Sequence, residues 1–190
     1  MVDNTSINSE NIHPLESNWT LWYHNPSDKN WDLKSYKNVI EINCLEDFCT
    51  LKNSWNKCLP DVTEGMFFFM RKKNNTIIYP QWEDKNNRKG GYWSVKISKE
   101  DSESVWYELI MYIIGETLTS GKYCSSGING ISISPKKYFC ILKIWNNDKN
   151  FKENDLLNEY INTFSDSLIY TNHEDNIKKD FTKRKNWNNS

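Results

Sequence analysis

The 190-residue sequence lacks long apolar segments and any stretch that resembles a targeting signal. Its longest apolar runs, residues 66–70 and 109–114, are far shorter than the ~20 residues that a membrane-spanning helix requires. The first ten residues are polar and acidic, with neither the cationic start nor the apolar stretch of a secretory signal. We therefore expect a cytoplasmic protein with no membrane-spanning helix.

Paired cysteines and an excess of one charge are also missing. The cysteines are odd in number and lack the CxxC spacing of zinc sites, so we expect reduced thiols rather than a disulfide framework or a metal centre; they are Cys44, Cys49, Cys58, Cys124 and Cys140. The 24 basic and 25 acidic side chains nearly cancel. Any binding of nucleic acid must therefore come from a local cluster of charges.

Sequence motifs of common enzymes are absent as well. The histidines His13, His24 and His173 are isolated, and the sequence contains no phosphate loop, GxSxG or HExxH. A cysteine nucleophile paired with a histidine stays open, although no cysteine has a recognisable reactive context. We expect no catalytic residues, no metal and no cofactor.

Aromatic residues are abundant: nine Trp, ten Tyr and eight Phe. Each ring can bury roughly 150 to 250 Å², so an aromatic core is expected in a chain with only 37% hydrophobic residues. The length fits one domain. Asparagine is also frequent, as in the pairs at 74–75 and 86–87, and we assign it no function.

Hydrophobic periodicity predicts short strands with three helices between them. Strands are expected at 19–24, 39–42, 66–71, 92–97, 128–134, 139–145 and 167–171, and amphipathic helices at 46–59, 100–118 and 151–164. The order lacks regular βαβ alternation, which indicates an α+β fold with the helices on one face of a sheet and the other face free for a ligand.

The two ends are expected to lie outside this fold. Residues 1–12 lack periodicity and predict a mobile arm. Residues 176–190 form a basic tail in which five cations alternate with Phe181 and Trp187. The tail is either a solvated end or an accessory RNA contact.

Two tryptophans fall in segments predicted to be loops. Trp31 follows the turn-forming residues 26–30, and Trp82 is followed by the acids Glu83 and Asp84. Loop tryptophans beside carboxylates suit a flat cationic ring. Either tryptophan alone would more often be an ordinary rim or core residue.

The ordered set of motifs carries more information than either tryptophan. It comprises HPL at 13–15, WTLW at 19–22, Trp31, EDF at 46–48, QWED at 81–84, GGYW at 90–93, WYE at 106–108, IGE at 114–116, ING at 128–130 and IW at 144–145. Over about residues 13–175, this order resembles the eukaryotic translation initiation factor 4E family, the mRNA cap-binding proteins. The resemblance implies a strongly curved antiparallel sheet, with three helices on its convex face and the cap in its concave face.

The resemblance also implies the roles of four side chains. Trp31 and Trp82 would sandwich the 7-methylguanine ring, which methylation at N7 makes a delocalised cation that is attracted to ring faces. Glu83 would accept hydrogen bonds from N1 and N2 of the base. Trp145 would lie against the N7 methyl group.

The phosphate-binding residues depart from the family pattern. Lys136 falls on the position of a family arginine, and a lysine provides a point charge in place of a fork. Tyr92, Tyr138 and Ile141 stand where cations are expected. The nearest substitutes are Lys137 and Lys143, and strand alternation would place Lys143 on the same face as Trp145.

A second departure concerns the surface that docks the initiation scaffold protein and its competing repressors. The docking residues implied by the resemblance are His13, Pro14, Leu45, Cys49, Tyr107 and Glu108. Cys49 stands in place of a tryptophan anchor, and Tyr107 in place of a leucine. Either scaffold binding is weak, or a divergent partner complements these residues.

We expect a monomeric protein that binds capped mRNA, with 7-methyl-GTP as the minimal ligand, and that acts in translation initiation without catalysis. Three alternatives stay open. In the first, the protein holds caps without recruiting the scaffold and so represses translation. In the second, it is an interaction protein without cap affinity, because its phosphate side has few cations. In the third, it is a hydrolase that uses His24 or Asp84 as a base.

Overall fold

The computed structural model describes residues 12–73 and 76–188, with side chains described up to residue 182. The arm expected at 1–12 therefore lies outside the described residues except for Ile12. Within the described residues no helix is long and apolar enough to cross a membrane.

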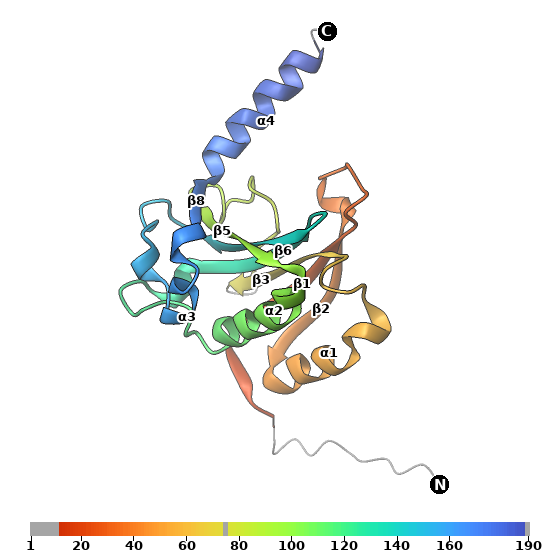
Figure 1. Ribbon diagram of the computed structural model, residues 1–190, viewed down its shortest axis with the longest axis vertical. Coiled ribbons are helices and arrows are strands. Elements are labelled where there is room, and N and C mark those ends of the chain that lie inside the picture. The colour runs from red at the N-terminus through yellow and green to blue at the C-terminus, as the bar shows by residue number, and fades with distance from the viewer. Residues whose placement is uncertain (1–11, 74–75, 189–190) are drawn as a thin grey trace.

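The described strands form one eight-stranded sheet in which all neighbours are antiparallel (Figure 1). The spatial order is β2-β1-β3-β6-β7-β5-β8, with β4 paired to β3 outside this path. The strands are β1 (Pro14–His24), β2 (Tyr36–Cys44), β3 (Met66–Lys73), β4 (Thr76–Ile77), β5 (Gly91–Ser98), β6 (Ile128–Pro135), β7 (Phe139–Asn146) and β8 (Ile169–Asn172).

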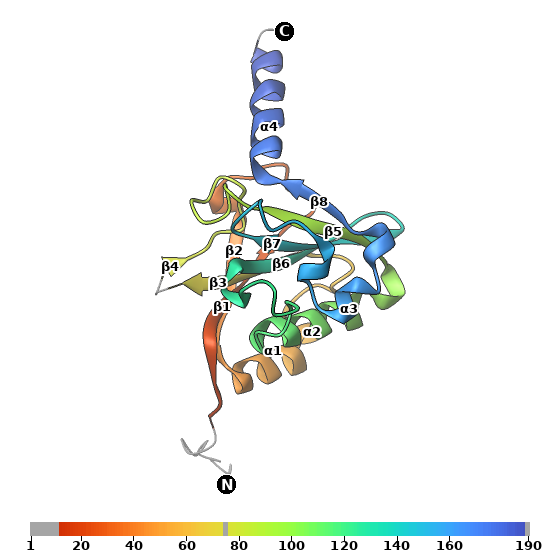
Figure 2. The same ribbon diagram turned by 90° about the vertical axis from the view of Figure 1, so that its left-hand side faces the viewer.

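Helices α1 (Leu45–Cys58), α2 (Lys99–Ile114) and α3 (Glu159–Asn162) lie on one side of the curved sheet, and α4 (His173–Asn188) projects away from the opposite side (Figure 2). Helix α2 begins where the Ser98 hydroxyl accepts a hydrogen bond from the Asp101 N–H at 3.0 Å, and the Asp47 carboxylate accepts the Cys44 N–H at the start of α1. The α+β fold expected from the sequence, with helices on the convex face, is confirmed.

Strand β1 shows how the sequence builds both faces. Its alternation sends Trp19 and Leu21 into the main core beneath α1 and α2. The intervening Trp22 lies in a second cluster on the concave face, with Phe68 and Trp145. The sheet thus carries apolar side chains on both faces, as the period of two in residues 19–24 predicts.

The helix expected at 151–164 is wrong in extent. The structure has 3₁₀ turns at Asn154–Leu156 and Ser165–Ser167, and the single turn α3 lies between them. Leu157 instead makes an isolated β-bridge to Thr119, and the Asn158 side chain caps α3 by accepting the Ile161 N–H at 3.1 Å. Asparagine favours such caps over helix interiors. The apolar spacing there is satisfied by burial without a continuous helix.

The residues expected as a basic tail at 176–190 are helical through residue 188. Lys178, Lys179 and Phe181 are exposed, with Phe181 65% accessible. The side chains of Lys183, Arg184, Lys185 and Trp187 lie outside the described residues, so an RNA contact of this segment stays a prediction.

Candidate ligand-binding site

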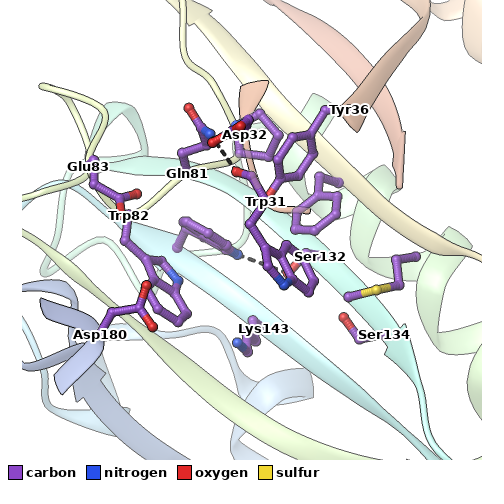
Figure 3. Close-up of a pocket in the computed structure, with 14 residues that line it drawn as sticks. Trp31, Asp32, Tyr36, Gln81, Trp82, Glu83, Ser132, Ser134, Lys143 and Asp180 are labelled. Atoms are coloured by element: carbon purple, nitrogen blue, oxygen red, sulfur yellow. Dashed lines mark hydrogen bonds between the residues drawn. The ribbon is translucent and has the colours of Figure 1, made fainter. Parts of the chain in front are cut away.

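A cavity of about 370 Å³ opens on the concave face between two loops and helix α4 (Figure 3). It is lined by Trp31, Asp32, Tyr36, Met66, Phe68, Pro80, Gln81, Trp82, Glu83, Ser132, Ser134, Lys143, Trp145 and Asp180. The structure brings together all four side chains that the sequence predicts to contact a flat base. We call this cavity the tryptophan slot.

Trp31 is 47% exposed and projects from the loop between β1 and β2. One face of its indole is covered by the His24 ring, which stacks at 4.3 Å between centroids and 4° between planes. His24 is fully buried, and its Nε2 is 2.9 Å from the Asn30 carbonyl oxygen. Trp31 is therefore supported from behind and can receive a second ring on its other face.

Trp82 enters the slot from the loop between β4 and β5. The Gln81 amide donates a hydrogen bond to the Trp31 carbonyl oxygen at 2.9 Å and so links the two tryptophan loops. Glu83 is exposed at the rim of the slot. Burial, together with the charge of Glu83, raises the pKa of Tyr36, which keeps this phenol neutral.

Buried amides hold the Trp82 loop in place. Asn87 is 0% exposed and donates to the carbonyl oxygens of Tyr79 and Gln81 at 2.8 and 2.9 Å. Asn129 in turn donates to the Asn87 side chain at 2.9 Å. Asn87 and Asn129 thus have a structural role in this loop, because a side-chain amide supplies both the donors and the acceptor that these hydrogen bonds need.

The double glycine after this loop has a steric role. A Cβ on Gly90 would collide with the backbone of Asn146, and one on Gly91 with the backbone of Thr171. The loop can therefore return to the sheet closely enough to begin β5 between β7 and β8.

Trp145 forms the floor of the slot. It is 2% exposed, its Nε1–H donates to the Ser132 hydroxyl at 2.9 Å, and its ring packs edge-on against Phe68 at 6.3 Å. A tryptophan fixed in this way presents a rigid apolar surface to whatever enters between Trp31 and Trp82.

Of the three lysines predicted to hold phosphates, Lys143 alone lines the slot. Its Nζ lies 4.2 Å from the Tyr92 ring centroid and 5.9 Å from that of Trp82. Burial, followed by the charge of Lys136, lowers the pKa of Lys143 to about 8. Lys136 and Lys137 are exposed on the turn between β6 and β7.

Sequence reasoning missed Asp180. Helix α4 brings its carboxylate to the slot beside Trp82, about a hundred residues further along the chain (Figure 3). No sequence pattern near Asp180 indicates that it reaches the slot, because residues 176–190 are predicted to lie outside the fold. The slot thus has two acidic groups near its second tryptophan, Glu83 and Asp180.

The predicted docking residues lie at the start of β1 and on α1 and α2. His13, Pro14, Leu45 and Cys49 are exposed, and His13 hydrogen-bonds Glu46 with 2.7 Å between Nδ1 and Oε1. These hydrogen bonds lower the pKa of Glu46 to about 2. Tyr107 is only 8% exposed, since its ring packs edge-on against Trp55 at 5.7 Å, and Glu108 is half-buried.

The polar groups of the slot suit binding better than bond cleavage. The two bases considered for a hydrolase are occupied: His24 contacts a backbone carbonyl, and Asp84 accepts the N–H groups of Tyr79 and Asn86. The cavity is lined by aromatic rings, by the lysine Lys143 and by three acidic residues, Asp32, Glu83 and Asp180. Such a set can hold a flat, positively charged ring that carries an anionic substituent.

The chain is similar to known proteins over nearly its whole length. The model of the eukaryotic initiation factor 4E family matches residues 14–188. Eukaryotic translation initiation factor 4E1 of Drosophila melanogaster is 34% identical over 146 residues, which cover 74% of this chain and 52% of that protein. The match thus spans about half the length of this curated relative.

Two solved structures share the fold. Ascaris suum eIF4E-3, solved with an m7G cap, has a TM-score of 0.59 and 28% identity, covering 81% of this chain and 80% of that one. Caenorhabditis elegans eIF4E-3, solved with the 4E-binding protein Mextli and a cap analog, has a TM-score of 0.68 and 24% identity, covering 88% and 96%. Since the family model covers most of the sequence, the resemblance inferred from the ordered motifs is confirmed, and the chain belongs to the eukaryotic initiation factor 4E family.

Proposed function

We propose that the tryptophan slot binds the 7-methylguanosine cap of mRNA and that the protein acts in translation initiation, in the cytoplasm and without catalysis. The observation that carries the proposal is the pair of loop tryptophans that line one cavity together with a carboxylate at its rim. The Ascaris relative, which was solved with an m7G cap, supports the same ligand class. Residues 13–175 form the proposed cap-binding domain.

The base is held by charge as well as by stacking. In the proposed complex, 7-methylguanine lies between Trp31, which His24 supports, and Trp82. A cation over an indole gains ~2 kcal/mol or more once water is excluded, and this gain is not available to unmethylated guanine. Glu83 accepts hydrogen bonds from N1 and N2, which adenine does not offer, and Trp145 contacts the N7 methyl group.

The triphosphate is assigned to lysines. The Lys143 ammonium lies over the Tyr92 ring, and a pKa of about 8 leaves most of these side chains charged at pH 7. In the proposed complex a phosphate forms a charge-assisted contact with this half-buried ammonium group. Lys136 and Lys137, exposed beyond the slot, are proposed to add weaker contacts.

Titration calorimetry with 7-methyl-GTP and GTP tests the base site. Wild-type protein should bind the methylated nucleotide at least tenfold more tightly than GTP. Trp82→Ala and Glu83→Gln should each weaken 7-methyl-GTP by more than tenfold, equivalent to about 1.4 kcal/mol or more. Glu64→Gln, an exposed carboxylate beyond α1, is the matched control and should bind normally. Unchanged affinity in both slot variants would contradict the proposed site.

The same titrations separate base contacts from phosphate contacts. Lys143→Gln should weaken 7-methyl-GTP more than 7-methylguanosine, and it should reduce the dependence of affinity on salt. If both ligands weaken equally, Lys143 positions the rings and does not bind phosphate.

The partner is proposed to dock on the convex side, as a helical peptide of the initiation scaffold or of a divergent equivalent. Leu45 and Cys49 are exposed one turn apart on α1, and Cys49 offers a small thiol where a large anchor would fit. Cys49→Trp should strengthen binding of a 4E-binding peptide at least fivefold, as measured by fluorescence anisotropy. Weak binding by the unaltered chain would favour the alternative role, a cap-binding repressor.

A further inference from the structure

One stripe of helix α4 packs on the concave face of the sheet. His173 is 0% exposed and its ring lies 4.9 Å from that of Trp145, while the Asn176 amide donates to the Tyr92 hydroxyl at 3.2 Å. Asp180 lines the slot, and positions 173, 176 and 180 have the i, i+3, i+7 spacing of one helix face. The helix found in place of the expected tail therefore forms one wall of the tryptophan slot.

The start of α4 is fixed by contacts with neighbouring segments. The His173 N–H donates to the Gly90 carbonyl oxygen at 3.1 Å, and the Lys149 ammonium pairs with the Glu174 carboxylate at 2.6 Å. Asp180 lies about two turns beyond His173, or roughly 10 Å along the helix axis at 1.5 Å per residue. The helix thus carries this carboxylate from a fixed origin to the slot (Figure 3).

The described side chains that line the slot include more carboxylates than cations. Asp32, Glu83 and Asp180 are acidic, and Lys143 is the basic residue among them. Figure 3 shows the Asp180 carboxylate beside the Trp82 indole. A slot with this charge is unfavourable for the phosphates of a nucleotide, so its carboxylates need a positively charged part of the ligand to offset the repulsion.

A carboxylate beside a stacking ring separates ligands by the charge of the base. Methylation at N7 makes guanine a delocalised cation, whereas unmethylated guanine is neutral. The carboxylate attracts the cation, has no net charge to attract on the neutral base, and repels the phosphates of both nucleotides. Specificity then comes from a repulsion that the wrong ligand cannot offset as well as from an attraction to the right one.

We propose that Asp180 is a specificity-determining residue of the tryptophan slot, whose carboxylate selects a flat base with positive charge and disfavours a phosphorylated neutral base. The inference rests on the proposed function, which assigns 7-methylguanine to the slot. Asp180 differs in role from Glu83, because the N1 and N2 groups assigned to Glu83 are present in methylated and unmethylated guanine alike. Those hydrogen bonds distinguish guanine from adenine, and Asp180 distinguishes the two forms of guanine.

Titration calorimetry with 7-methyl-GTP and GTP tests the proposal through the ratio of the two affinities. Asp180→Asn keeps the size of the side chain and should lower this ratio at least threefold, whereas Asp180→Glu, which keeps the charge, should retain most of it. Asp175→Asn is the matched control: it removes the same charge from an exposed position of the same helix, and its amide oxygen can still accept the Asn172 amide. The control should keep the wild-type ratio.

The ratio separates a charge effect from a structural one. A variant that merely distorts the slot weakens both nucleotides alike, so an unchanged ratio in Asp180→Asn, or a change equal to that of Asp175→Asn, would overturn the proposal. The melting temperature of each variant checks that the domain is folded.

A ligand without phosphates isolates the attraction to the base. Asp180→Asn should weaken 7-methylguanosine at least threefold, and the affinity of the wild-type protein for this ligand should fall as salt rises, more steeply than that of the variant. Equal affinities of the two proteins for 7-methylguanosine would overturn the proposal, because the carboxylate would then not act on the charge of the base.

Failure of the proposed function gives a different result. If the wild-type protein does not prefer 7-methyl-GTP to GTP, the cap assignment is wrong. N1-methylnicotinamide, a flat aromatic cation with neither phosphates nor the hydrogen-bonding edge of guanine, then tests Asp180 by itself. Binding of this cation that weakens at least threefold in Asp180→Asn supports the selection of cations, and binding that is absent or insensitive to the substitution overturns it.

Discussion

His173 lies directly behind the tryptophan slot, at the start of α4. Its ring is 0% exposed and packs 4.9 Å from Trp145 and 5.5 Å from Tyr92. Burial, followed by the charge of Lys143, lowers the pKa of His173 from 6.5 to about 3. The imidazole therefore stays neutral in the folded protein, where it serves as an aromatic packing element for the floor of the slot.

This burial predicts a loss of stability in acid. Below pH 6.5 the unfolded chain binds a proton at His173, whereas the folded chain does not until about pH 3, so the free energy of unfolding falls as the pH drops through this window. Between pH 7 and pH 5 the loss from this residue should be about 2 kcal/mol. His173→Phe should remove that part of the decrease, as measured by urea unfolding at both pH values. Identical losses in the two proteins would show that another group controls acid stability.

At the scale of elements, the loop between β4 and β5 is held by buried amides instead of by a regular element. Asn87 bridges the carbonyl oxygens of Tyr79 and Gln81, and Asn129 reaches it from β6. Fixing each loop residue costs roughly 1–2 kcal/mol of backbone entropy, and these buried hydrogen bonds offset part of that cost. These hydrogen bonds therefore fix the loop that carries Trp82 at the slot.

Removal of this support should affect binding at a distance from the ligand. Asn87→Ala leaves two carbonyl oxygens without their donors, which should lower the free energy of unfolding by about 1–3 kcal/mol. It should also weaken 7-methyl-GTP about tenfold in a calorimetric titration. Lys85→Ala, an exposed position in the same loop, is the control. Wild-type affinity in the Asn87 variant would mean that the ligand itself orders the loop.

At the scale of the whole molecule, one buried ion pair joins distant parts of the chain. The Arg71 guanidinium on β3 donates to both oxygens of Glu116 at 2.6 and 2.9 Å and to the carbonyl oxygens of Ile128 and Ser125. It also stacks 4.3 Å from the Trp19 ring. Burial alone would raise the pKa of Glu116, but the hydrogen bonds and charge of Arg71 outweigh it and lower that pKa.

Breaking this pair should destabilise the whole domain. Glu116→Gln leaves the Arg71 charge buried without its counter-ion, so the free energy of unfolding should fall by about 3–5 kcal/mol. Glutamine keeps the length of the side chain at a residue with a positive φ of 54°, so the effect reports the charge. Glu103→Gln, exposed on α2, is the control in a urea titration. A change below about 1 kcal/mol would show that Arg71 is stabilised without Glu116.

Most of the sheet could be predicted from the sequence because its signal is local. Alternation in residues 19–24 and 139–145 reports which side chains share a face, whatever the strands pair with. The prediction of a continuous helix at 151–164 was wrong because apolar spacing reports only which side chains are buried. The backbone conformation there depends instead on the Asn158 cap and on the β-bridge of Leu157 to Thr119. Trp31, Trp82 and Glu83 could be named because they belong to short motifs in fixed order.

The sequence by itself determined the strand faces, the aromatic core and the three tryptophans of the slot, whereas Tyr36 and Phe68 were not predicted to line it. The tertiary structure alone decided the depth of Lys143, the support of Trp31 by His24, the buried position of His173 and the arrival of Asp180 beside Trp82. These features depend on strand register and on where α4 returns to the sheet. They join residues far apart in the chain, and the charge, burial and packing of each side chain are set by neighbours that its own segment does not contain.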